Sequence, residues 1–210
     1  MNKRAIAFLL TLTSLLLITA CTAPKPATSP TPEITPITIP EESTVPEESA
    51  APAASETSRV SFGKFTATDL NGNEVTQDIF SNSDLTMINI WATFCGPCLQ
   101  EMPGLGALSS EYADKGLQVV GIVVDVLDSS GAVSSSQVDL AKEIVQKTGA
   151  AYTHLLPSED LIRIKLNAVS AVPETVFVDK NGDVVGEPLV GSRSEDDWKA
   201  IIDKYLEEVK

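Results

Sequence analysis

The hydrophobic residues of this chain divide it into three regions with different patterns. An apolar and hydroxyl-bearing run extends from Ala5 to Ala20, directly after the basic residues Lys3 and Arg4. The stretch from Thr22 to Ser58 is rich in Pro, Thr, Ser, Ala and Glu and almost free of aromatic residues. Beyond it, apolar residues recur with the periods of strands and helices. The pattern therefore predicts one folded domain, at residues 59–210.

Within this domain, strand patterns alternate with helix patterns. Two short extended runs surround Asn71-Gly72, and a second hairpin is predicted on Asn181-Gly182. The elements predicted between these turns are strands at 85–92, 117–125 and 151–156 and helices from 98 to Gly116, at 138–148 and at 158–166. A last helix with one apolar stripe begins after Ser194. This order predicts a three-layer α/β fold.

The first 20 residues have the anatomy of a secretory signal. Their apolar run is on the short side for a membrane-spanning helix, which needs about 20 residues. The stretch Ile18-Thr19-Ala20-Cys21 resembles a bacterial lipobox, in which the cysteine is lipidated and becomes the mature N-terminus. We therefore predict a signal peptide at 1–20 and a lipid anchor on Cys21. Ordinary cleavage near Ala20 or Ala23 is the alternative.

The segment at 21–58 is predicted to be a disordered tether. Its composition cannot bury enough apolar surface to offset the entropy of ordering, and its prolines favour extended conformations. The net charge of −14 argues against a nucleic-acid partner, which needs a basic footprint, and against charge-driven adhesion to anionic lipid. We therefore expect an extracytoplasmic domain that is held at a bacterial membrane only by its lipid anchor.

Cys95 and Cys98 carry the candidate chemistry, because they follow a predicted buried strand and begin a helix. The free N–H groups and partial positive charge of a helix start favour a thiolate. Cys95 lies before the first turn, where we expect it to be exposed, and Cys98 lies one turn inside. We therefore predict that Cys95 attacks a disulfide and that Cys98 resolves the mixed disulfide.

Two other uses of the cysteine pair are less favoured. Zinc needs four ligands, whereas the sequence offers no second pair and a single histidine, His154. A purely structural disulfide across so short a loop would stabilise the fold little. We therefore expect no metal, and no cofactor beyond a redox-active Cys95–Cys98 disulfide. His154 is expected to be a structural or surface residue.

The stretch "WATFCGPC", at Trp91 to Cys98, resembles the active site of thioredoxin-fold proteins. With the following "LQEMP" it is similar to the TlpA/ResA family of membrane-anchored thiol-disulfide oxidoreductases. "FTATDLNG" before the core and "VPETVFVDKNG" after it fit the same family, so the resemblance covers about residues 62–205. It implies a thioredoxin-like α/β/α fold with an N-terminal β-hairpin extension and a central insertion.

The resemblance also implies roles for residues outside the cysteine pair. Pro173 matches a proline that follows a cis peptide bond, here after Val172, and faces the cysteines. Glu101 matches an acidic residue near the active site of ResA-like proteins, and Glu174 matches the "PET" of cytochrome c maturation reductases. Both glutamates are candidates for proton exchange with Cys98. The alternative for each is a solvated glutamate at the end of an element.

Substrate contacts are expected around the same motif, with the Val172 backbone pairing with an incoming chain. The residues concerned are Trp91, Phe94, Gly96, Pro97, Val172 and Pro173. Phe94 stands where many relatives have a second tryptophan, which keeps an apolar collar. Asn89 stands where thioredoxin has a buried aspartate. Because asparagine cannot titrate, an acid from Glu101 or Glu174 becomes more necessary.

The function that the resemblance implies is the reduction of disulfides in exported proteins, such as apocytochrome c or a methionine sulfoxide reductase. A membrane electron donor of the CcdA/DsbD kind would re-reduce the pair. One rival is a peroxiredoxin-like thiol peroxidase, although Ala92 and Ile88 stand where peroxiredoxins carry Thr or Ser and Pro. The other rival is a non-catalytic binding module with an inert bridge. The loop at 127–137 is a candidate border of the site.

Overall fold

The computed structural model describes residues 60–210, which fold around a five-stranded mixed sheet. The strand order is β5-β4-β3-β6-β7; β3, β4 and β5 are parallel, and β6 and β7 run antiparallel to their neighbours. The strands are β3 (Leu85–Trp91), β4 (Leu117–Val123), β5 (Thr153–Leu155), β6 (Glu174–Asp179) and β7 (Val184–Val190). The predicted signal, Cys21 and the predicted tether lie outside the described residues. Within 60–210, no helix is long and apolar enough to cross a bilayer.

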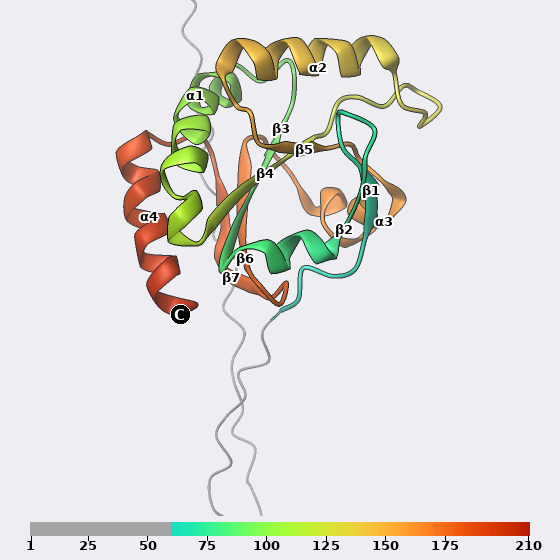
Figure 1. Cartoon of the computed structure of the whole chain (residues 1–210). Coiled ribbons are helices and arrows are strands. Elements are labelled where there is room, and N and C mark those ends of the chain that lie inside the picture. The colour runs from blue at the N-terminus through green and yellow to red at the C-terminus, as the bar shows by residue number, and fades with distance from the viewer. Residues whose placement is uncertain (1–59) are drawn as a thin grey trace, which may run out of the picture. The chain divides into compact units, whose positions relative to one another are not determined.

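Helices α1 and α4 cover one side of the sheet and α3 the other, while α2 lies across its end (Figure 1). The α-helices are α1 (Gly96–Glu111), α2 (Ser135–Thr148), α3 (Glu159–Ile164) and α4 (Glu195–Glu208). Short 3-10 helices are η1 (Gln77–Asn82), η2 (Ala113–Lys115) and η3 (Leu166–Ala168). Since successive strand residues point to opposite faces, Met87 of β3 packs under α1 and α4, and Ile88 packs toward α3. The predicted three-layer α/β/α architecture is confirmed.

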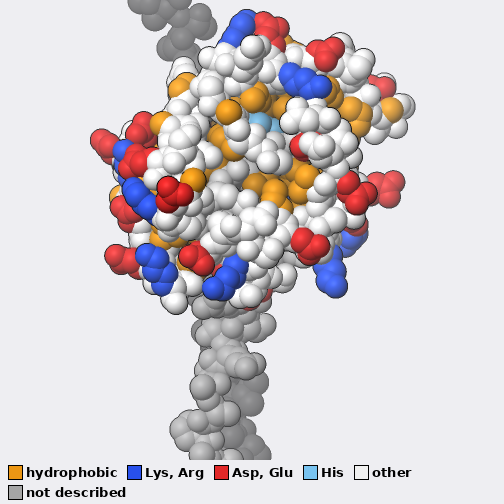
Figure 2. Space-filling model, viewed as in Figure 1, with side chains coloured by type: hydrophobic (Ala, Val, Ile, Leu, Met, Phe, Trp, Pro, Cys, Tyr) orange, Lys and Arg blue, Asp and Glu red, His pale blue; other side chains and the backbone are white. Residues whose placement is uncertain are grey.

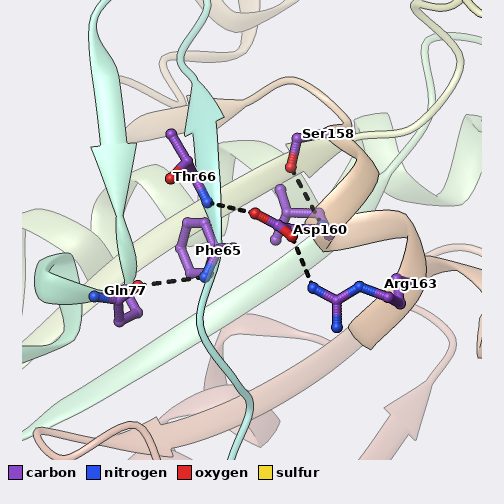
Figure 3. A network of polar contacts seen from close by, with 7 residues as sticks. Phe65, Thr66, Gln77, Ser158, Asp160 and Arg163 are labelled. Atoms are coloured by element: carbon purple, nitrogen blue, oxygen red, sulfur yellow. Dashed lines mark hydrogen bonds and ion pairs between the residues drawn. The ribbon is translucent and has the colours of Figure 1, made fainter.

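The N-terminal hairpin extension is present as β1 (Thr66–Thr68) and β2 (Glu74–Thr76), antiparallel around the turn at Asn71-Gly72. Figure 3 shows how it is fastened to α3. The Thr66 amide donates to Asp160 Oδ2 at 3.1 Å, and Asp160 also pairs with Arg163 one turn later on the helix. The hairpin and α3 therefore form one unit on this side of the sheet.

The two edges of the sheet are covered differently. At the β5 edge, the Leu70 amide of the hairpin turn donates to the His154 carbonyl oxygen at 2.9 Å. At the β7 edge, the Val184 amide donates to the Val60 carbonyl oxygen at 2.8 Å, and further along the strand Pro188 has no amide hydrogen to offer. Residues outside the five strands therefore form hydrogen bonds along part of each sheet edge.

Three helices differ from their predicted limits. Helix α1 begins at Gly96 and ends at Glu111, and the 3-10 helix η2 leads from there to the predicted stop at Gly116. Helix α2 begins at Ser135 rather than 138, because its first turn is polar and carries no hydrophobic period. The helix predicted at 158–166 is interrupted: α3 ends at Ile164, and Lys165 leaves helical geometry with φ −140° before η3. The Lys165 ammonium forms an ion pair with Glu174 of β6, which is a long-range contact that a local pattern does not reveal.

Candidate active site

Cys95 and Cys98 form a disulfide at the point where β3 passes into α1. Cys95 is the N-cap residue, and the Cys98 amide nitrogen lies 3.2 Å from the Cys95 sulfur. The turn before it is held by Asp125, whose carboxylate accepts from the Thr93 amide and hydroxyl at 3.0 and 2.5 Å. The Cys98 amide at the start of α1 thus points toward the Cys95 sulfur, a setting that stabilises a thiolate there after reduction.

The expected exposure of Cys95 is wrong for this disulfide form. Cys95 is 6% exposed and Cys98 is 0% exposed. The Cys95 sulfur is bonded to Cys98 and lies 3.5 Å from the Val172 carbonyl oxygen, so neighbours cover it on two sides. Cys95 is still the more accessible cysteine, as its position before the first helical turn predicts.

The bond between Val172 and Pro173 is cis, as the resemblance implied. Pro173 is buried, and its carbonyl oxygen accepts from the Gly191 amide at 2.8 Å. The Val172 carbonyl oxygen faces the Cys95 sulfur. The segment before β6 therefore lies directly against the disulfide, although it is 77 residues away in the chain.

The residues expected to contact substrate occupy two different environments. Phe94 is 77% exposed, and Gly96 and Pro97 are also exposed, so these three form accessible surface beside the disulfide. Trp91 is 0% exposed and belongs to the same buried cluster as both cysteines. Trp91 therefore lies behind the surface and not on it.

Glu101 is buried one turn after Cys98 and accepts three hydrogen bonds. Its Oε1 accepts from Asn89 Nδ2 at 3.0 Å, and its Oε2 accepts from the Arg193 amide at 3.1 Å and the Trp198 indole at 3.3 Å. Burial raises the pKa of Glu101, and the hydrogen bonds from Arg193, Asn89 and Trp198 oppose that rise. The arrangement is a buried acid whose affinity for a proton is higher than that of an exposed carboxyl group.

Glu174 is buried on the opposite face of the sheet from Glu101. Glu174 is paired with Ile90 and Thr175 with Asn89, and adjacent strand residues point to opposite faces. Thr175 accepts from Asn89 on the α1 face at 3.4 Å, so Glu174 points to the α3 face, where it pairs with Lys165. The structure thus places only Glu101 on the helix that carries Cys98.

The sequence pattern did not identify the residues that hold Glu101. Arg193 and Trp198 lie 92 and 97 residues away from it, in the β7–α4 connection and in α4. Trp198 falls in the apolar stripe predicted for the last helix, which fits its buried ring but does not reveal the partner of its indole N–H. Only the packing of α4 on α1 brings these donors to the carboxylate.

Such a sheet, with a disulfide at a helix start after a central parallel strand, is that of the thioredoxin-fold disulfide oxidoreductases. Comparison with known proteins identifies the family within this class. Residues 46–202 match the Redoxin family, to which the chain belongs, and its relatives place it with the ResA/TlpA-like proteins.

Two curated relatives and one solved structure illustrate the similarity. The chain is 26% identical over 159 residues to thiol-disulfide oxidoreductase ResA of Bacillus cereus, which covers 74% of this chain and 82% of that protein. It is also 26% identical over 145 residues to ResA of Bacillus thuringiensis subsp. konkukian, covering 69% and 74%. A crystal structure of a thioredoxin-family thiol:disulfide interchange protein from Chlorobium tepidum aligns with a TM-score of 0.60 at 22% identity, covering 72% of this chain and 99% of that one. The last comparison bears on the fold alone.

Proposed function

We propose that the chain is a membrane-tethered, extracytoplasmic reductase of protein disulfides whose redox centre is the Cys95–Cys98 pair, with no further cofactor. The observation that carries the proposal is the placement of the Cys95 sulfur. It lies at the amide end of α1 and next to the Val172 carbonyl oxygen, at the most accessible point of the pair. A thiolate there is stabilised by the helix start and adjoins backbone that an extended substrate can pair with.

The reaction proceeds in two exchanges. The Cys95 thiolate attacks one sulfur of the substrate disulfide, the substrate S–S bond breaks, and the other substrate sulfur leaves as a thiolate that takes up a proton. The Cys98 thiol then loses its proton and attacks Cys95, which releases the second substrate thiol and leaves the Cys95–Cys98 disulfide. Two electrons pass from the pair to the substrate.

Glu101 serves the second exchange in this proposal. Cys98 is fully buried, so its thiol cannot give its proton directly to bulk water. Glu101 follows it at i+3 on the same helix, and its raised pKa suits it to accept a proton from the thiol and return it later.

The proposed compartment and partners are argued from the sequence and not from the geometry of the described residues. The lipobox resemblance at Cys21 supports a lipid anchor, and the composition of 21–58 supports a tether. The Gly96-Pro97 dipeptide resembles that of reducing thioredoxins. Exported proteins such as apocytochrome c or a methionine sulfoxide reductase are the proposed substrates, and a membrane donor of the CcdA/DsbD kind would re-reduce the pair.

Trapping the mixed disulfide tests the proposal. In Cys98→Ala the second exchange cannot occur, so Cys95 should remain bonded to its substrate, which mass spectrometry would identify after non-reducing electrophoresis. Cys95→Ala is the matched control and should trap nothing. Absence of any Cys95-linked protein in the native host would contradict the proposal. Turnover of hydrogen peroxide that requires Cys95 but not Cys98 would indicate a peroxidase instead.

A further inference from the structure

His154 is a buried histidine whose two ring nitrogens both have partners. Its Nδ1 lies 3.1 Å from the Trp91 indole nitrogen, and its Nε2 lies 2.9 Å from the Ala150 carbonyl oxygen. The indole can only donate and the carbonyl can only accept, so the ring is neutral and carries its proton on Nε2. His154 therefore uses its single acceptor for Trp91.

The neighbouring strand is shaped to admit this imidazole. Gly121 of β4 is the cross-strand partner of His154, and a Cβ at Gly121 would lie 2.1 Å from His154 Nδ1. The Tyr152 ring stacks on the imidazole with centroids 4.4 Å apart, and the Trp91 ring meets it edge-on at 5.5 Å. The Tyr152 and Trp91 rings thus hold the imidazole in the space that Gly121 leaves open.

Trp91 in turn contacts His154 and belongs to the buried cluster that contains the disulfide. It is the last residue of β3, directly before the turn that leads to Cys95, and it is fully buried in the cluster that contains both cysteines. Its carbonyl oxygen accepts from the Val124 amide at 2.9 Å, which fixes the backbone, whereas the His154 bond fixes the ring.

We propose that His154 is a positioning residue of the redox site: by accepting the Trp91 indole N–H, it holds the Trp91 ring in place behind the Cys95–Cys98 pair. The inference rests on the proposed disulfide-reductase function. His154 touches neither cysteine, so its effect on the reaction passes through Trp91.

Neutrality of the imidazole is part of this arrangement. Burial lowers the pKa of His154 to about 4, so that Nδ1 keeps its lone pair throughout the neutral range. The titratable group packed against the ring is Tyr152, and Glu101 acts electrostatically on Tyr152 from α1. Trp91 of β3, Gly121 of β4 and the Ala150 carbonyl bring no ionisable side chain to it.

The test compares two substitutions of His154 in the full-length chain. His154→Leu removes the acceptor, whereas the side-chain oxygen of His154→Asn can replace Nδ1. We expect His154→Leu to reduce the insulin disulfides at least about tenfold more slowly than wild type, and His154→Asn to stay within about threefold. The ¹H–¹⁵N chemical shift of the Trp91 indole should change in His154→Leu, where the hydrogen bond is lost. In His154→Asn it should keep the value of a hydrogen-bonded indole.

A double-mutant cycle with Trp91→Phe separates positioning from general destabilisation. Because Trp91→Phe removes the donor, adding His154→Leu to it should slow the reaction little further. Equal rates for wild type and a folded His154→Leu, equal losses for Leu and Asn, or additive effects in the cycle would each overturn the inference. If His154→Leu does not fold, Trp91→Phe is compared with Trp91→Phe/His154→Asn instead. Because Trp91→Phe has already removed the donor, His154→Asn must cause no further loss of rate.

The two proposals fail in different ways. A wild-type chain that reduces no protein disulfide would refute the proposed function and the inference together. An active wild type with an equally active, folded His154→Leu would refute the inference alone.

Discussion

Glu101 is the buried acid of the helix that carries Cys98. Asn89, which stands where thioredoxin has an aspartate, donates to Glu101 and does not compete with it for a proton. Asn89 Oδ1 has no hydrogen-bond partner among the described residues. Two buried acids at this spot would titrate as a coupled pair, whereas Glu101 beside an amide titrates with a single pKa, which burial raises.

Glu101→Gln should slow the release of the mixed disulfide and flatten the pH dependence of that step, because the proton acceptor is gone. A raised pKa means that folding favours the protonated carboxyl: this stabilisation is complete below the ordinary carboxyl pKa and is lost as pH rises through the raised value. Glutamine cannot ionise, so Glu101→Gln should be at least as stable as wild type at pH 8. Stopped-flow kinetics from pH 5 to 9 and urea unfolding at pH 8 measure the two effects.

Glu174→Gln is the matched control, since Glu174 lies on the other face of the sheet. Removing one partner of its buried ion pair with Lys165 should cost about 3 kcal/mol of stability. The pH profile of the exchange should remain that of wild type. A flattened pH profile in Glu174→Gln with an unchanged one in Glu101→Gln would show that Glu174, and not Glu101, is the proton acceptor.

At the scale of elements, the local sequence pattern predicted those features that local interactions determine. The two hairpin turns, the buried strands β3 and β4, and the caps of α3 and α4 are where Asn-Gly pairs, apolar runs and serines indicated them. The cysteine pair at the start of α1 was predicted for the same reason. The environment of Glu101 was not predictable from local pattern, because α4 supplies it through tertiary packing.

Close approach between two helices gives a prediction at this scale. A Cβ at Gly106 of α1 would lie 2.4 Å from the Gly149 carbonyl oxygen at the end of α2. Gly106→Ala should therefore push α2 away and lower the free energy of unfolding by about 1–3 kcal/mol. Gly104→Ala on the same helix is the control, since its Cβ would meet only the Glu195 side chain at 3.6 Å. It should leave stability unchanged or raise it by up to about 1 kcal/mol. Equal losses in urea unfolding would contradict the account.

At the scale of the whole molecule, charge and attachment describe how the domain meets its partners. Figure 2 shows acidic side chains around the outline of the viewed face with basic ones between them, and apolar side chains toward the middle. The net charge of −14 disfavours contact with an anionic bilayer. In the proposed function, membrane association therefore depends on the anchor on Cys21 and not on the domain surface.

Cys21→Ser should move the protein from the membrane fraction to the soluble extracytoplasmic fraction, because lipidation requires the thiol. The exchange activity of the purified chain should not change, since the redox pair lies in the described domain. Fractionation with immunoblotting, alongside an insulin-reduction assay, measures both. Retention of Cys21→Ser in washed membranes would refute the lipid anchor.

The covered sheet edges have a consequence for molecules confined together on one surface. Tethered copies meet far more often than copies in free solution, and exposed strand edges are templates for pairing between chains. Here hairpin residues occupy the outer edge of β5, while Val60 and the missing amide of Pro188 interrupt that of β7. If copies are tethered as proposed, the covered edges disfavour strand pairing between them, and the proposed substrate would find its backbone partner at Val172, beside the disulfide.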